Sequence, residues 1–355
     1  MATVDTGTYV NHKTLQSWAK AIFIKIGVNE SDATTLTDSL IAANLRGVDT
    51  HGVTRMLMIY VKRIQCGVMN AVSEIEVVRE KPATALIDCH NSIGQVGARF
   101  AMQKAVEKAK VTGTSFVATT HSNHYGAAAY WAMMALEHGM IGFSSVNAPA
   151  AVAPTGGRSP MFGTNPFAIA IPAGNNIPFV LDMATTVVAR GRVALYEKQG
   201  KALAEGWAFD ASGKPTTDAK AALNGLLAPV GGYKGYGIAF AVDILSGVLT
   251  GSNFGKHFPG MLAENLEKPT DVGGVFAAID INCFMDLQEF TDRMETALAE
   301  VRGCDKVEGV ERIYIPGEIE HDTSVERART GVPLPDSILA EFVGLGDALG
   351  IPFPK

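Results

Sequence analysis

The chain has 355 residues, with 47% hydrophobic and 19% charged side chains and a formal net charge of -6. This globular balance excludes extended disorder, and the acidic charge offers no basic footprint for nucleic acid. The length exceeds the usual size of one domain, so we expect a core divided into two or three lobes.

Targeting and membrane segments are not expected. The amino terminus shows no basic flank followed by an apolar run, which argues against a signal peptide. The longest apolar stretch, residues 235–251, contains Asp243 and is too short to span a bilayer. The four cysteines are scattered without a CxxC pair, a pattern that favours reduced thiols in the cytoplasm.

Two helices are predicted near the amino terminus. Apolar residues follow a helical spacing over residues 31–45, and a second series runs over residues 51–66 before a glycine. Thr50 is the expected cap of the second helix. His51 would then lie in the first turn of that helix, with Arg55 four positions later on the same side.

An α/β unit is predicted next. A strand near residues 83–87, a helix over 98–110 and a β-branched strand near 115–120 occur in the order typical of such units. The polar segment 121–126 follows the second strand, at the end of the sheet where ligand sites are common. A helix of small residues, 127–136, comes after it.

The second half of the chain alternates short strands, long connections and helices. Between residues 141 and 181, short apolar runs separated by turn residues predict a sheet with functional connections. No GxGxxG follows a strand, so a bound dinucleotide would not depend on a Rossmann fold. Helices are predicted from Gly235, over 287–301 and over 337–349, and the last could pack against the amino-terminal helices.

Residues 156–237 contain glycine clusters where an ordinary core would show periodic apolar residues. Glycine permits close backbone approaches that side chains forbid, so clusters beside Lys234 and Asp182 predict main chain wrapped around an anionic ligand. The role that best fits Lys234 is a contact with a phosphate or a ribose. Asp182 could orient a histidine, bind a ribose hydroxyl or a nicotinamide amide, or cap a turn.

Three histidines are candidate site residues. An imidazole at His51 could exchange a proton with a hydroxyl or carbonyl oxygen, and Arg55 offers a fork suited to a carboxylate. From spacing alone, a structural role is more common than a functional one: His51 would hydrogen-bond to the backbone at the helix start, and Arg55 would be exposed to solvent. His121 and His124 lack the HExxH pattern and a third ligand nearby, so we expect no metal. His124 is a catalytic or orienting candidate, with a structural histidine as the alternative.

Eight ordered motifs make the chain resemble the type-2 malate/L-lactate dehydrogenase family, whose relatives include ureidoglycolate dehydrogenase, sulfolactate dehydrogenase and diketogulonate reductase. The resemblance extends over nearly the whole chain. Together the motifs are far more specific than any one alone, and they favour the functional interpretations above. They are residues 46–52, 122–126, 154–157, 163–166, 182–185, 206–207, 231–235 and 316–318.

The resemblance implies an α/β fold with a non-Rossmann NAD(P)-binding domain, a largely antiparallel sheet and a helical domain formed by both chain termini. We expect the helical domain over residues 1–78 and 310–355, an α/β substrate-side segment over 79–135 and the NAD(P)-binding domain over 136–309. The family also implies a homodimer whose active site lies at the subunit interface.

By motif match, the resemblance implies that His51, His124 and Asp182 are catalytic and that Arg55 binds the substrate carboxylate. The implied cofactor contacts are Thr164, Pro166, Asp182, Met183, Ala184, Lys234, Gly317 and Glu318. Relatives often place an aromatic residue four positions after the arginine, where this chain has Ile59. Tyr60 follows, about 100 degrees around a helix, so a substrate role is not transferred to it.

The predicted function is reversible oxidation of a small 2-hydroxy acid, malate or L-lactate first, to its 2-keto acid. NAD is the expected cofactor, with NADP possible. His51 is the first choice for the group that accepts the hydroxyl proton, and His124 the second. The alternatives are an NADPH-dependent reductase of a cyclic imine carboxylate or larger keto acid, a zinc-dependent hydrolase, and a noncatalytic ligand-binding protein.

Overall fold

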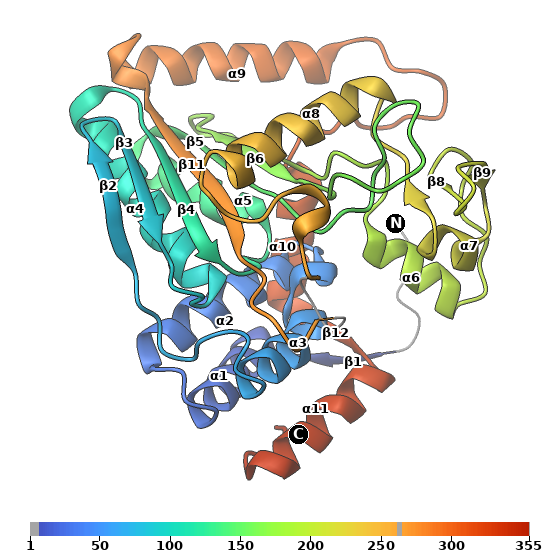
Figure 1. The fold of residues 1–355 in the computed structure, drawn as a ribbon. Helices are drawn as coiled ribbons and strands as arrows, with labels where there is room; N and C mark the ends of the chain where they lie inside the picture. Colours follow the sequence, from blue (N-terminus) through green and yellow to red (C-terminus); the bar gives the residue numbers. More distant parts are fainter. Residues whose placement is uncertain (1–6, 261–264, 355) are drawn as a thin grey trace.

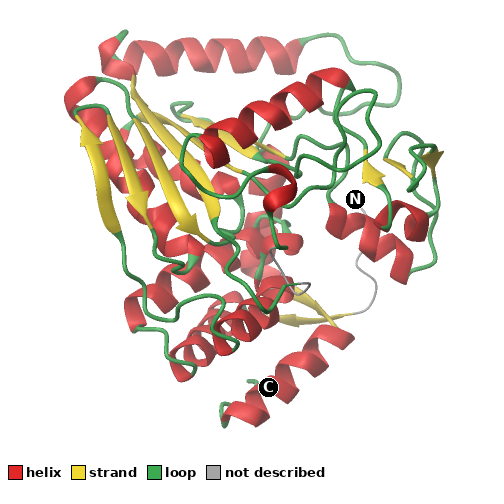
Figure 2. Ribbon diagram, in the orientation of Figure 1, coloured by secondary structure: helices red, strands yellow, loops and turns green. Residues whose placement is uncertain are grey.

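A seven-stranded sheet forms the centre of a computed structural model that describes residues 7–260 and 265–354 (Figures 1 and 2). The strand order is β2-β3-β4-β11-β5-β6-β7, and β3 and β4 are its parallel pair while the other neighbours are antiparallel. The strands are β2 (Glu76–Lys81), β3 (Thr84–Asp88), β4 (Phe116–Ser122), β5 (Met140–Val146), β6 (Phe167–Ile171), β7 (Phe179–Met183) and β11 (Val272–Asp280). The predicted α/β fold with a largely antiparallel sheet is confirmed.

The predicted strand–helix–strand unit is present as β3, helix α4 (Gly94–Thr112) and β4. Strands β3 and β4 pair in parallel from Thr84 and Phe116 onward. Alanines on the buried face of α4 let the helix approach the sheet closely, and α4 ends before Gly113, whose φ is 81°. The polar segment after β4 therefore leaves the sheet at the carboxyl end of a strand, as predicted.

Strand β11 lies between β4 and β5 and was not predicted from the sequence. It pairs with both neighbours in antiparallel register, and five consecutive residues, 272–276, are buried. A strand covered on both faces shows no alternation of apolar and polar residues, so periodicity does not identify it. Gly273 has no room for a side chain, because a Cβ atom there would meet the carbonyl of Ser246.

The two ends of the described chain pack together. Helices α1 (His12–Lys25), α2 (Glu30–Leu45) and α3 (Val53–Gln65) share one hydrophobic cluster with Val332, Leu334 and Phe342. Strand β1 (Gly7–Val10) pairs antiparallel with β12 (Val332–Pro335), which leads into α11 (Asp336–Leu349). Helix α11 thus packs against the amino-terminal helices (Figure 1). The domain boundaries given above remain a prediction.

A smaller lobe lies beside the large sheet (Figure 1). It contains a three-stranded sheet in the order β10-β8-β9, together with α6 and α7.

No helix of the described residues is long and apolar enough to cross a membrane. The other α-helices and strands are α5 (Ala128–Met133), α6 (Arg190–Lys198), α7 (Ala219–Leu223), α8 (Tyr233–Asp243), α9 (Leu287–Gly303), α10 (Glu318–Thr330), β8 (Ala208–Phe209), β9 (Pro215–Thr216) and β10 (Leu226–Leu227).

Candidate active site

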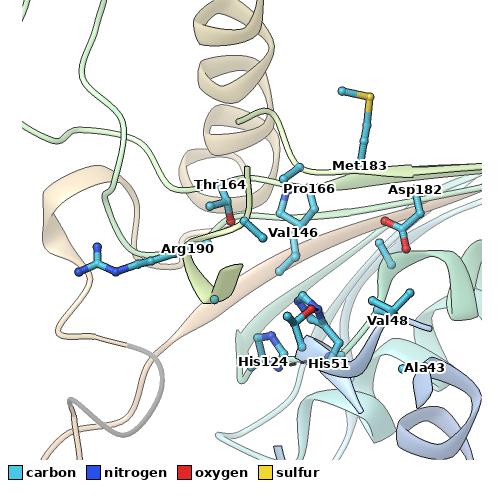
Figure 3. A pocket seen from close by; sticks show the side chains of 18 of the residues that line it. Ala43, Val48, His51, His124, Val146, Thr164, Pro166, Asp182, Met183 and Arg190 are labelled. Atoms are coloured by element: carbon cyan, nitrogen blue, oxygen red, sulfur yellow. Dashed lines mark hydrogen bonds between the residues drawn. The ribbon is translucent and has the colours of Figure 1, made fainter. Parts of the chain in front are cut away.

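A cavity of about 1060 Å³ is lined by segments that are far apart in the sequence (Figure 3). They include α2, the start of α3, the loop after β4, the end of β7, the start of α6 and the first turn of α10. Most of the predicted site residues meet here, although the sequence separates them widely. Those in the lining are His51, Arg55, His124, Thr164, Pro166, Asp182, Met183, Ala184 and Gly317.

Lys234 and Glu318 are not among the described residues that line the cavity. Lys234 is exposed in the first turn of α8. Glu318 is buried, and its carboxylate accepts the Ile315 N–H at 3.0 Å and forms ion pairs with Arg302 and Arg312. Burial alone would raise the pKa of Glu318, but the Ile315 N–H and the two ion pairs outweigh it and lower the pKa. Its carboxylate therefore joins α9 and α10.

The turn that carries His51 differs from the prediction. A 3-10 turn, η1 (Asp49–His51), precedes α3, and Gly52 occupies the cap position without a side-chain bond. The expectation that Thr50 caps the helix is wrong, because Asn44 of α2 supplies the oxygen: its Oδ1 accepts the Val53 N–H at 2.7 Å. The Thr50 hydroxyl instead lies 2.9 Å from His51 Nδ1.

His51 and His124 lie side by side on one wall of the cavity (Figure 3). Their rings stack with centroids 5.5 Å apart and an interplanar angle of 18°. Burial, followed by the positive charge of Arg55, lowers the pKa of His51 to about 4. Burial, followed by charges at His51, Arg55 and Arg63, also places the pKa of His124 well below its ordinary value. Both imidazoles are therefore neutral at pH 7.

The tautomer of His124 follows from its hydrogen bonds. The Gly126 N–H, which can only donate, points to Nδ1 at 3.3 Å, so Nδ1 is an acceptor. The Tyr60 hydroxyl, 2.6 Å from the same atom, must then donate to it. Gln95 Nε2 donates to the Tyr60 oxygen at 3.0 Å, which is consistent with this direction. The proton of neutral His124 is therefore on Nε2.

Asp182 lies at the end of β7 with its carboxylate toward the cavity (Figure 3). One of its oxygens accepts the Ala129 N–H at 2.9 Å. Although this side chain is open to the cavity, the surrounding protein desolvates it and raises the pKa of Asp182 to about 6, against the opposing effects of that N–H and Arg46. Arg46 and Glu320 also line the cavity. This end of the cavity thus carries charges of both signs.

Arg55 lies against the first turn of α6. A Cβ atom on Gly191 would collide with the Arg55 guanidinium, so this glycine allows the two elements to approach. The neighbouring Arg190 points away from the histidines (Figure 3) and donates to the Leu223 carbonyl at 3.2 Å. Arg55 is therefore the arginine on the histidine side of this wall.

His121 lies outside the cavity lining. Its Nδ1 is 2.9 Å from Asp88 Oδ2, and its backbone φ is 48°. Across residues 7–260 and 265–354, no three His, Cys, Asp or Glu side chains are grouped so as to hold a metal ion. The arrangement therefore gives no support to the zinc-hydrolase alternative.

Sequence reasoning missed the partners that orient the site. It gave Tyr60 no substrate role, and it did not consider Gln95 or Glu320. Arg46 stands in a quoted motif, 46–52, but received no role. No local spacing indicates these partners, since Gln95 and His124 reach Tyr60 from other segments of the chain.

The comparisons with known proteins agree with this fold. Residues 10–343 match the family model described as malate/L-lactate dehydrogenase. The chain is 41% identical to the malate dehydrogenase of Pyrococcus abyssi, with 95% of this chain and 94% of the relative covered. It is 38% identical to the L-sulfolactate dehydrogenase of Methanocaldococcus jannaschii, covering 92% and 93%. The structure of malate dehydrogenase from Entamoeba histolytica superposes with a TM-score of 0.94 at 34% identity, covering 99% and 100%.

The fold, the family model and these relatives thus show an NAD(P)-dependent dehydrogenase of 2-hydroxy acids. The chain belongs to the malate/L-lactate dehydrogenase family. This membership makes it an oxidoreductase, so the hydrolase and noncatalytic alternatives are set aside.

Proposed function

We propose that the chain oxidises malate or L-lactate to the corresponding 2-keto acid, with NAD as the preferred cofactor. The observation that carries the proposal is the meeting of Arg55, His51 and His124 on one side of a cavity. Thr164, Pro166 and residues 182–184 are also in its lining. A carboxylate anchor, proton-transfer groups and a cofactor surface are then close together.

The cavity suits a dinucleotide together with a small acid. Its volume lies just above the usual range for ligand sites, about 300–1,000 Å³. Val146, Ala148 and Pro166 offer apolar surface for a flat ring, and Thr164 and Asp182 offer polar groups for an amide or ribose. When bound, the nicotinamide supplies the hydride chemistry. Cofactor contacts at Lys234 and Glu318 would require movement or a partner subunit.

The two histidines receive different tasks. Arg55 binds the substrate carboxylate, which places the 2-hydroxyl near the imidazoles. His124, with its proton on Nε2, donates a hydrogen bond to the substrate oxygen. In this proposal His51 carries its proton on Nδ1, which lies 2.9 Å from the Thr50 hydroxyl, so that Nε2 accepts the hydroxyl proton during oxidation. A carboxylate on Arg55 offsets the charge that lowers the pKa of His51, so substrate binding makes His51 a better base.

Activity measurements test the proposal. Malate, lactate, larger 2-hydroxy acids and a cyclic imine carboxylate are assayed with NAD(H) and NADP(H) by the absorbance of the reduced cofactor. His51→Ala should lower turnover roughly 100-fold or more, as expected for loss of a positioned acid–base group. Exposed His138 provides the control, His138→Ala. Normal turnover in His51→Ala, with loss in His124→Ala, would transfer the base role to His124.

We also propose that the enzyme acts as a homodimer in the cytoplasm, with the partner subunit completing the active site. Sedimentation of the purified chain with and without NADH measures the assembly. A fully active monomer would contradict the shared site.

A further inference from the structure

We infer that Arg327, in the last turn of α10, is a positioning residue that holds the turn carrying His51. The inference rests on the proposed base role of His51. Arg327 lies outside every motif quoted from the sequence, and 278 positions separate it from Asp49, to which it binds. Arg327 is not among the described residues that line the cavity, and its hydrogen bonds go to Asn44 and Asp49. We therefore expect any effect on the reaction to pass through the turn.

The Arg327 guanidinium binds the Asp49 carboxylate with two hydrogen bonds. Nη1 donates to Oδ1 at 2.7 Å and Nη2 donates to Oδ2 at 3.0 Å. Nη1 also donates to the backbone carbonyl of Asn44. Paired bonds of this kind fix both the distance and the angle between the groups. The Arg327 side chain is 14% exposed and Asp49 33%, so water competes only partly for these bonds.

Asn44 extends this grip through the turn. It is fully buried, and its Nδ2 donates to Asp49 Oδ1 at 2.6 Å and to Thr54 Oγ1 at 3.1 Å. The Thr54 hydroxyl donates to the Asp49 carbonyl at 3.1 Å. The turn η1 itself has no side-chain cap bond. Its orientation, and hence that of His51 two residues after Asp49, therefore depends on contacts from α2, α3 and α10.

Helix α10 connects this turn to the cavity. Its first turn lines the cavity through Ile319 and Glu320, while its last turn binds Asp49. Between them, Thr323 packs on Gly47, where a Cβ atom would lie 3.2 Å from Thr323 Cγ2 and φ is 78°. This glycine permits the close approach of α10 to the connection between α2 and η1. One rigid helix therefore links the wall of the cavity to the base.

Arg327→Met retains the aliphatic stem and removes the grip. We expect kcat to fall about 10-fold while the KM for NAD changes less than 2-fold, since sub-ångström misplacement of a reacting group slows the chemistry. Arg327→Lys keeps the charge but not the fork, and should recover only part of the loss. The control is Arg329→Met, which changes an exposed arginine of the same turn.

Thermal unfolding shows that each variant is folded at the assay temperature, and Asp49→Asn replaces Arg327→Met if that variant does not fold. Normal kcat in the folded variant would overturn the inference.

The same change in a His51→Ala background shows whether the effect passes through His51. We expect less than a 2-fold further loss there, and a repeated 10-fold loss would overturn the inference. If His51→Ala alone keeps normal turnover, the proposed base role of His51 fails, and the positioning role is judged by NMR instead. The ring resonance of His51 should then shift in Arg327→Met and not in Arg329→Met. An unshifted resonance would show that Arg327 does not hold the turn.

Discussion

The pKa of His51 is lowered by two causes of different kinds, burial and a neighbouring charge. Burial is the larger cause of its fall to about 4, and the charge of Arg55 is the second. The folded chain therefore binds the His51 proton more weakly than the unfolded chain. This lowered pKa favours the unfolded state as pH falls from about 6.5 toward 4, and the same protonation removes the base for oxidation.

Arg55→Met should raise the pKa of His51 in the free protein. The new value should stay below 6.5, because burial remains. An NMR titration of the His51 ring measures the shift, with Arg329→Met as the control for loss of a distant charge. The same pKa in both variants would exclude a contribution from Arg55.

Tyr60→Phe removes the donor that holds His124 Nδ1. The loss of one hydrogen bond, worth about 1 kcal/mol, should lower kcat roughly 3- to 10-fold because the Nε2–H tautomer is then favoured less strongly. Tyr9→Phe, at an exposed position of β1, is the control. Unchanged kcat in Tyr60→Phe would show that the Gly126 N–H is sufficient to orient the ring.

At the scale of elements, the site forms where helices from different parts of the chain meet with little space between them. Gly191, in the first turn of α6, allows this helix to approach Arg55 of α3. The cavity wall thus includes the start of α6 and the arginine side chain. A side chain at this position would force one of them to move.

Gly191→Ala should therefore displace the Arg55 guanidinium. We expect the KM for the 2-hydroxy acid to rise about 10-fold, the scale of a small misplacement, with little change in NADH affinity. Gly303→Ala is the matched control, because a Cβ atom there meets nothing within 4 Å. Steady-state kinetics and fluorescence titration with NADH measure the two quantities. Equal KM values in both variants would mean that Arg55 relaxes without loss of binding.

At the scale of the whole molecule, the carboxyl-terminal segment completes the amino-terminal core. Phe342 of α11 is fully buried, and its ring lies 5.1 Å from that of Trp18 in α1. Strand β12 pairs with β1 in the same region. The chain ends therefore stabilise the helices from which η1 and His51 extend.

Phe342→Ala should lower the free energy of unfolding by about 3–5 kcal/mol, because it leaves a cavity in this core. Val343→Ala changes the next residue, which is 41% exposed, and should alter stability far less. Urea denaturation followed by tryptophan fluorescence compares them. A similar small loss in both would mean that the α11 contact contributes little to stability.

The sequence by itself determined the family and the largely antiparallel non-Rossmann fold, and it supplied His51, His124, Asp182 and Arg55 as candidates for the chemistry. It also located α2, α3 and the unit of β3, α4 and β4, because helical spacing and strand order are local properties of the chain. Thr164, Pro166 and residues 182–184, which the resemblance implies as cofactor contacts, lie in the cavity lining, and their binding of a cofactor stays a prediction.

Only the tertiary structure decided which groups meet. It placed β11 at the centre of the sheet, made Asn44 of α2 rather than Thr50 the acceptor for the first N–H of α3, and brought the Tyr60 hydroxyl to His124. It also brought Arg327 to Asp49 from far along the chain. The physical reason is that such partnerships depend on how whole elements pack, whereas the spacing of residues in a sequence reports only the surface that each element buries.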